Sequence, residues 1–282
     1  MLKTLRCLTV AIVVCIALGA MVPGVSVALP VVGAMNEGEM SVLLKEGADL
    51  FRQANATVGR RPEDAKELYG KAVMRFERIA GEGGIHNGQL YCDIGNAYFR
   101  MEDLGRAILN YRRAALYTPN DVNLRQNLEY ARSKRSDKVD VGQKTKILNT
   151  LFFWHYDLSA KTRALFFLVL FMAGWAAAIL RIFLQRSWIG WVIGVTAVLA
   201  VLLLGSVAVE EWSMRTLKAG VIVGRDVIAR KGDSETYEPS FTEPLHAGTE
   251  FEVVEQRPEW YQIELADGRR CWIPWKSSEL IQ

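Results

Sequence analysis

Histidine, cysteine and proline are scarce in this chain, whose 282 residues include three histidines, four cysteines and eight prolines. So few thiols exclude a small disulfide-stapled scaffold, and so few histidines leave little material for a metal cluster. The 34 Lys and Arg nearly balance the 31 Asp and Glu, so the net charge of +3 does not indicate a nucleic-acid partner. Half of the residues are hydrophobic and 23% are charged, which predicts strongly apolar segments joined to polar domains.

Catalytic patterns are missing as well. His86, His155 and His246 lie in three different segments, and none stands in an HExxH or Ser-His-Asp context. The glycine-rich residues 81–84 lack the Lys-Ser/Thr pair of a phosphate-binding loop. The sequence therefore predicts a protein that is not an enzyme, with no catalytic residues, no cofactor and no metal ligands.

The N-terminus has the three-part pattern of a secretory signal peptide. Lys3 and Arg6 precede an apolar run over residues 7–20, and small residues follow at the usual spacing for cleavage. We expect residues 1–28 to be the signal peptide, and an uncleaved N-terminal anchor is the alternative.

Two charge-free runs are long enough to cross a bilayer, once the first is extended past Arg181 to residue 184. We predict transmembrane helices at residues 164–184 and 188–209. The three residues between them, 185–187, favour a tight hairpin. A buried helix pair in a soluble protein is the alternative.

The leader sets the expected orientation, because it places the residues that follow it outside the cytoplasm. The turn with Arg181 and Arg186 then faces the cytoplasm, and both soluble parts lie on the periplasmic side of the inner membrane, in a multi-pass protein. Lys161 and Arg163 agree poorly with this orientation, since they flank the first span on its outer side. Without an exported leader, both soluble parts would be cytosolic.

Residues 88–121 follow the 34-residue tetratricopeptide pattern of two packed helices, which cross where Gly95 and Ala107 are small. The residues that match it are Tyr91, Ile94, Gly95, Tyr98, Ala107, Tyr111, Ala114 and Pro119. An upstream copy repeats part of this pattern, with a turn over residues 55–64 that is about five residues too long. Residues 122–134 can form a capping helix. We predict a tetratricopeptide domain at residues 36–135, with two repeats and this cap.

A concave groove that binds a peptide is the usual function of such repeats. We expect Asp93, Asn96, Asn123 and Asn127 to line this groove and bind a protein partner. A set of arginines on the second repeat forms either a binding patch or a solvated helix face. These are Arg100, Arg106, Arg112 and Arg113.

The juxtamembrane residues 136–163 are first basic and then aromatic, with Trp154 and Tyr156 close to the first span. This order is typical of a segment that lies along lipid headgroups.

The C-terminal residues 219–282 contain five short runs of alternating hydrophobicity, which predict strands, and a hairpin signal at residues 266–268. The runs are residues 219–223, 227–230, 249–255, 260–265 and 270–274. Four stretches here resemble the motifs of bacterial SH3 domains: residues 229–232, 248–253, 259–263 and 268–273. The resemblance implies a small barrel over the whole segment.

Aromatic side chains beside the loops of that family often contact ligands. Tyr237 and Trp275 are the candidates for an exposed binding surface, whereas Trp260 and Trp272 are either core residues or further ligand contacts.

The sequence thus predicts a multi-domain membrane protein: all-α tetratricopeptide repeats, a two-helix transmembrane hairpin and a small all-β SH3-like barrel. This order resembles the BatE-type aerotolerance proteins, whose genes neighbour MoxR-type ATPases and von Willebrand A membrane proteins. The resemblance implies a non-enzymatic envelope scaffold that supports a stress-tolerance complex of such proteins. Expected partners are envelope or membrane proteins, von Willebrand A proteins included, and the lipid bilayer. The alternative is a module that binds or senses peptidoglycan through the barrel.

Overall fold

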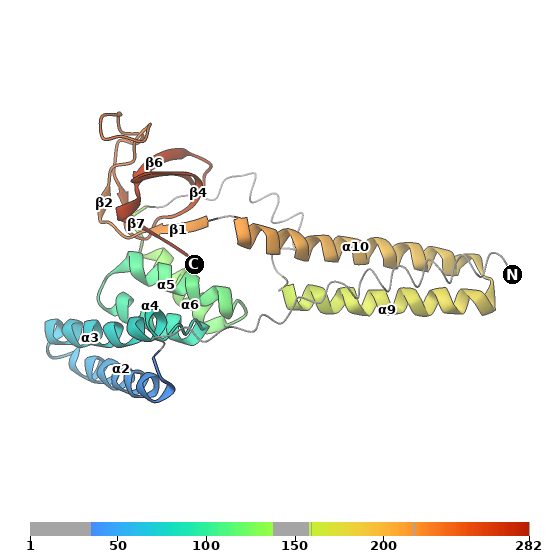
Figure 1. The fold of residues 1–282 in the computed structure, drawn as a ribbon, viewed down its shortest axis with the longest axis horizontal. Helices are drawn as coiled ribbons and strands as arrows, with labels where there is room; N and C mark the ends of the chain where they lie inside the picture. The colour runs from blue at the N-terminus through green and yellow to red at the C-terminus, as the bar shows by residue number, and fades with distance from the viewer. Residues whose placement is uncertain (1–34, 138–157, 159, 217, 282) are drawn as a thin grey trace. The chain divides into compact units, whose positions relative to one another are not determined.

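The computed structural model describes residues 35–137, 158, 160–216 and 218–281. The expected signal peptide and most of the expected juxtamembrane segment lie outside the described residues. The described chain contains seven α-helices and a small antiparallel β domain (Figure 1).

Five consecutive helices form an α-helical array: α2 (Glu37–Thr57), α3 (Pro62–Gly81), α4 (Gly88–Arg100), α5 (Leu104–Tyr117) and α6 (Val122–Ser133). Each helix packs against the next one in the chain. Four of them begin at a residue whose side-chain oxygen accepts a hydrogen bond from a backbone N–H of the first turn. These caps are Asn36, Asn87, Asp103 and Asp121. The remaining helix, α3, begins at Pro62, whose missing backbone N–H costs nothing because the first N–H groups of a helix have no partner within it.

The long turn expected in the upstream copy is not present. Helices α2 and α3 are 21 and 20 residues long, against 13 and 14 for α4 and α5. The extra residues therefore lengthen the helices, and residues 58–61 alone separate them. Within α2, Phe51 packs edge-on against Tyr69 of α3, which gives the added turns an apolar contact.

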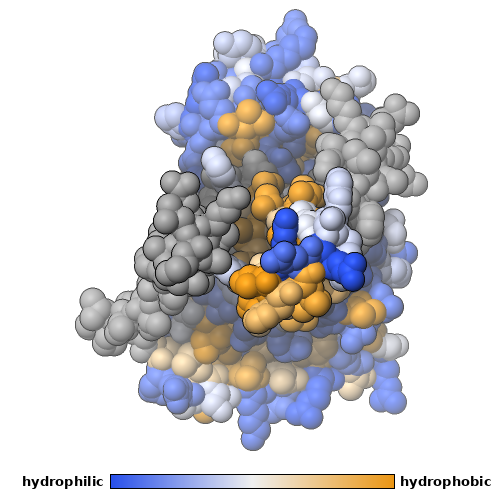
Figure 2. Space-filling view, turned by 90° about the vertical axis from the view of Figure 1, so that its right-hand side faces the viewer, coloured by the Kyte–Doolittle hydropathy of each residue, from blue (hydrophilic) through white to orange (hydrophobic). Residues whose placement is uncertain are grey.

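The two apolar runs are helices α9 (Ala160–Leu184) and α10 (Ser187–Thr216), which pack side by side (Figure 1). Both are long and apolar enough to cross a membrane, over Thr162–Leu184 and Ser187–Val209. Most of their side chains are exposed, as Figure 2 shows for the hydrophobic end of the pair. A glycine at position 174 lets α9 approach Thr196 of α10, since a Cβ there would lie 3.2 Å from the threonine hydroxyl oxygen.

The β domain has two sheets, and both are antiparallel. The larger has the order β6-β5-β4-β1-β7, formed by Arg270–Pro274, Trp260–Leu265, Glu250–Arg257, Lys218–Ile222 and Ser278–Leu280. The smaller pairs β2 (Asp226–Val227) with β3 (Leu245–His246).

Seven strands replace the five expected runs. The run expected to extend from Val227 to Arg230 is a strand for its first residue alone, because Arg230 leaves the ladder and forms isolated bridges to Pro239 and Trp272. The added strand β7 pairs with β1 near the C-terminus of the chain.

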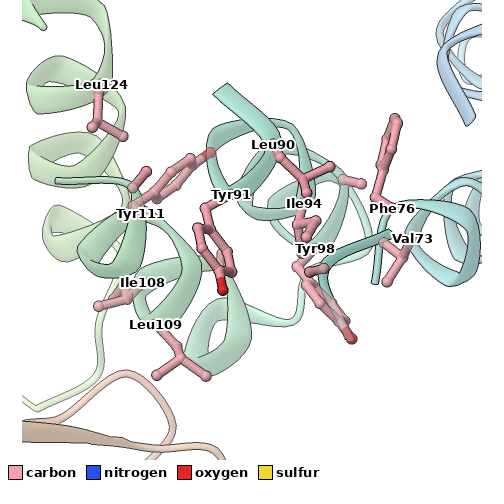
Figure 3. Close-up of a cluster of buried hydrophobic side chains, with 14 of the residues drawn as sticks. Val73, Phe76, Leu90, Tyr91, Ile94, Tyr98, Ile108, Leu109, Tyr111 and Leu124 are labelled. Carbon is pink, nitrogen blue, oxygen red and sulfur yellow. The ribbon is translucent and has the colours of Figure 1, made fainter. Parts of the chain in front are cut away.

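The core of the helical array draws on α3, α4, α5 and α6, whose apolar side chains converge in Figure 3. Helices α4 and α5 are in close contact at Gly95, where a Cβ would lie 2.7 Å from the Tyr111 ring. Ala107, which stands at the same crossing, is completely buried. Small residues therefore set the distance between the two helices, as the sequence pattern predicts.

Candidate protein-binding surfaces

Asn96 of α4 and Asn127 of α6 meet in the structure, although 31 positions separate them. Asn96 Oδ1 accepts hydrogen bonds from the Tyr111 hydroxyl at 2.9 Å and from Asn127 Nδ2 at 3.2 Å. The Asn96 amide nitrogen faces Cys92 Sγ at 3.8 Å. Both carboxamides are half-buried, so this small network joins α4, α5 and α6 as well as lining the surface.

One helical turn further along each helix, Phe99 of α4 and Tyr130 of α6 form an aromatic pair with ring centroids 5.6 Å apart. The Lys134 ammonium lies 5.1 Å from the Tyr130 centroid. We call the surface made by Asn96, Phe99, Asn127, Tyr130 and Lys134 the α4/α6 face. The aromatic pair was not predicted from the sequence. Its spacing could have indicated it, because residues three apart on a helix share one side, as Asn96 and Phe99 do.

The two other expected groove residues lie close to this face. Asp93 is half-buried, and its carboxylate accepts a hydrogen bond from Gln89 at 3.1 Å. Burial raises the pKa of the Asp93 carboxyl. Asn123 is exposed on α6, one turn before Asn127. Burial also raises the pKa of the neighbouring Cys92 thiol to about 11, so this cysteine is not a reactive thiolate at neutral pH.

Four arginines were expected to form either a binding patch or a solvated helix face. Three of them instead lie beside the β domain. Arg112 lies 3.3 Å from Glu250 of β4, and Arg113 donates to the Leu280 carbonyl at 2.9 Å. Arg106 lies 3.6 Å from Glu279. These side chains of α5 therefore face the β domain, so they form neither an open patch nor a solvated helix face.

Glu250 is the centre of this contact between the helical array and the β domain, which we call the helix–sheet junction. Arg132 donates to both of its carboxylate oxygens at 2.8 Å, and Arg135 approaches one of them at 3.3 Å. Burial alone would raise the pKa of Glu250, but the hydrogen bonds from Arg132 and the charges of Arg132, Arg112 and Arg135 lower it below its ordinary value. The carboxylate is thus held ionised among arginines from α5 and from the end of α6.

A second acidic group of the junction lies just after α6. The Asp137 carboxylate accepts hydrogen bonds from the His246 backbone N–H at 2.7 Å and from the Thr249 hydroxyl at 2.6 Å, and it contacts His246 Nδ1 at 2.6 Å. The bond to Asp137 raises the pKa of His246. These contacts lower the pKa of Asp137 despite its partial burial.

Apolar contacts complete the junction. Val221 of β1 is fully buried in the core of the helical array, and Ile281 packs against that core. Glycine is required at position 105, because a Cβ there would lie 2.8 Å from the Ile222 carbonyl oxygen. The junction could not be predicted from the sequence, since its partners are more than 100 positions apart and carry no shared motif.

On the β domain, Tyr237 and Trp275 are exposed over 49% and 44% of their surfaces. Trp260 and Trp272 are buried, and the Arg257 guanidinium lies 4.7 Å from the Trp272 centroid. The two buried indoles are therefore core residues, and Tyr237 and Trp275 remain the accessible aromatics of the expected surface.

Within the described residues, no three His, Cys, Asp or Glu side chains gather as metal ligands would. The chain was also compared with known proteins. No protein-family model matches the chain, and no curated protein matches it significantly.

Proposed function

We propose that this protein is a non-enzymatic, membrane-held scaffold of the cell envelope, which binds another protein through the α4/α6 face. The observation that carries the proposal is the composition of this face. It combines an aromatic pair, a lysine and carboxamides on two helices of a repeat-like array. Aromatic side chains supply contact area and carboxamides supply directional hydrogen bonds, a combination suited to a peptide segment.

The finer description of the fold belongs to the same proposal. We assign α2–α6 to two tetratricopeptide repeats with a capping helix, and the β domain to the bacterial SH3-like barrels. The buried Gly95, Ala107 and Tyr111 at the crossing of α4 and α5 support the first assignment. The five-stranded antiparallel sheet supports the second. The order of these parts favours a BatE-type protein that supports a complex with MoxR and von Willebrand A proteins.

We further propose that α9 and α10 cross the inner membrane and that both soluble parts lie on its periplasmic side. The helix–sheet junction supports a shared side, because residues before α9 contact residues after α10. An even number of crossings is then required between them, and two apolar helices meet this requirement. Alkaline phosphatase fused after Arg135 or after Ile281 should be active, and fused at Gln185 inactive. The opposite pattern would place both parts in the cytosol.

Site-specific crosslinking in intact membranes tests the binding role. Asn96 is a poor choice for substitution, since it also joins three helices. Tyr130 is 55% exposed, so Tyr130→Ala should reduce the yield of a partner crosslink at Asn123 several-fold while leaving the fold intact. Met74→Ala on α3 is the matched control, because Met74 is 63% exposed and lies outside the α4/α6 face. Equal yields in all three proteins would mean that the helical array serves as a spacer.

The exposed Tyr237 and Trp275 favour a second candidate, in which the β domain binds peptidoglycan. The detergent-solubilised chain can be sedimented with purified peptidoglycan. We expect little retention, because exposed Glu235, Glu238 and Glu243 face a wall that also carries carboxylates. Strong retention that Trp275→Ala abolishes would promote this candidate over the scaffold.

A further inference from the structure

The hairpin of α9 and α10 has cations but no anions over residues 158–209. Its four basic residues are Lys161, Arg163, Arg181 and Arg186. The last two stand at the turn, where both side chains are exposed. Neither forms an ion pair with a carboxylate among the residues that the structure describes. The turn therefore presents two guanidinium groups whose counter-charge must come from outside the described chain.

The arrangement of this turn is specific. Arg181 belongs to the last turn of α9, and its guanidinium lies against Gly190 of α10, where a Cβ would be 3.1 Å from Nη1. Arg186 stands in the two-residue link, after Gln185 in a left-handed conformation with φ of 29°. Because glycine leaves room at position 190, the Arg181 side chain reaches across to the beginning of α10.

The surroundings of the two arginines are apolar. Ile182 and Phe183, directly after Arg181, are 67% and 78% exposed, and Trp188 and Trp191 of α10 are 58% and 78% exposed. Figure 2 looks onto this end of the hairpin and shows a small hydrophilic group among hydrophobic residues. Indole side chains prefer the headgroup layer of a bilayer, which sets the arginines at the depth of lipid phosphates.

We propose that the hairpin turn binds the phosphate of an anionic phospholipid, with Arg181 and Arg186 as its ligands. Guanidinium groups bind phosphate oxygens through paired N–H donors, and the positive end of the α10 dipole adds to the attraction. A free phosphate ion would neutralise the two cations but would leave the apolar Ile182 and Phe183 exposed to water. An anionic lipid does both, because its phosphate neutralises the arginines and its acyl chains cover the apolar side chains beside the headgroup. This inference rests on the proposed membrane placement of α9 and α10.

The test uses the full chain, reconstituted in nanodiscs that contain equal amounts of phosphatidylcholine and phosphatidylglycerol. Native mass spectrometry then measures which lipid the released protein retains. The unmodified protein should retain phosphatidylglycerol in preference. Each cation near a membrane surface contributes about a fivefold preference, so Arg181→Gln with Arg186→Gln should lower it by roughly 30-fold. The matched control, Arg125→Gln with Arg225→Gln, removes the same charge from exposed sites on α6 and the β domain and should change nothing.

A second variant keeps both charges. Gly190→Leu should displace the Arg181 guanidinium and lower the preference for phosphatidylglycerol several-fold. If the double variant fails to insert, this variant tests the proposal by itself. Equal lipid retention in the unmodified protein and both variants would overturn the inference. Displacement of the lipid by millimolar inorganic phosphate would also overturn it, in favour of a site for free anions. An unmodified chain that does not insert into any nanodisc would instead overturn the membrane placement itself.

Discussion

Charged side chains have opposite surroundings at the helix–sheet junction and at the hairpin turn. At the junction, Arg112, Arg132 and Arg135 gather around Glu250, and Asp137 accepts three contacts from His246 and Thr249. At the turn, two exposed arginines stand among apolar side chains, in a segment that contains no carboxylate.

The difference separates charges used for folding from charges left for an external partner. Partly buried ions are costly unless the chain itself supplies the opposite charge, and the junction supplies it with short hydrogen bonds. Exposed cations at a membrane surface have no such cost, because lipid headgroups and water surround them. The same residue type therefore holds domains together in one region and, under the proposed membrane placement, faces the bilayer in the other.

The largest expected effect comes from removing the negative charge of Glu250 at the junction. Glu250→Gln leaves three arginines around a neutral side chain that is only 20% exposed, which should destabilise the junction by about 3 kcal/mol. Hydrogen exchange of the full chain in detergent should show faster opening of β1 and α5. The control Glu252→Gln changes an exposed carboxylate of the same strand and should leave exchange unaltered. Unchanged exchange in Glu250→Gln would show that apolar contacts alone hold the junction.

A somewhat smaller effect is expected from overpacking the helices, with all charges kept. Ala107→Leu adds bulk at a completely buried crossing of α4 and α5, which should cost about 2 kcal/mol. Ala48→Leu adds the same atoms at an exposed position of α2 and serves as the control. Thermal unfolding of the two variants compares them. A similar melting temperature for both would contradict the tight crossing.

Changes of pH should weaken the junction in two separate ranges. The folded-state pKa of Glu250 lies below its ordinary value of 4.5, so its contribution is present above pH 4.5 and is lost as the pH falls through the lower value. The folded-state pKa of His246 lies above 6.5, so its contribution is present below pH 6.5 and is lost as the pH rises through the higher value.

The junction should therefore be most stable between about pH 4.5 and 6.5, as hydrogen exchange of β1 can measure. The loss at alkaline pH should not exceed about 1 kcal/mol, because the His246 ring is partly exposed. His246→Gln should remove the alkaline change and keep the acidic one. An alkaline change that persists in this variant would assign it to another group.

The smallest effect is expected at the hairpin turn. Arg186→Gln should change the unfolding free energy of the hairpin by less than about 0.5 kcal/mol, because the side chain is exposed and has no described ion pair. Steric trapping or thermal melting in neutral detergent can measure this. A loss of more than about 1 kcal/mol would mean that the turn uses its arginines for folding, and would remove the contrast with the junction.

Local sequence patterns predicted the helices and strands well where the residues of one element alone determine which of its sides is buried. The offsets of Gly95, Ala107 and Tyr111 indicated a close helix crossing, and the charge-free runs indicated two long apolar helices. The strand expected from Val227 to Arg230 was wrong beyond its first residue, because pairing with distant Trp272 overrides local alternation there.

The candidate binding surface was predicted in part. Asn96 and Asn127 form a hydrogen bond between α4 and α6. The aromatic pair beside them needs Tyr130 of α6 to reach Phe99 of α4, which the capping-helix assignment left open. The arginines of α5 could not be interpreted correctly, since their environment depends on a strand 138 positions away from Arg112.

The sequence by itself determined the helical array, the two apolar helices and the small β domain, because periodicity, caps and hydrophobic length are local properties. Tertiary structure alone decided that Glu250 and Asp137 bind the end of the helical array, and that Arg181 reaches α10 over Gly190. These pairings join residues distant in sequence or on separate helices. Their free energy arises from burial and charge that exist only after the chain has brought them together.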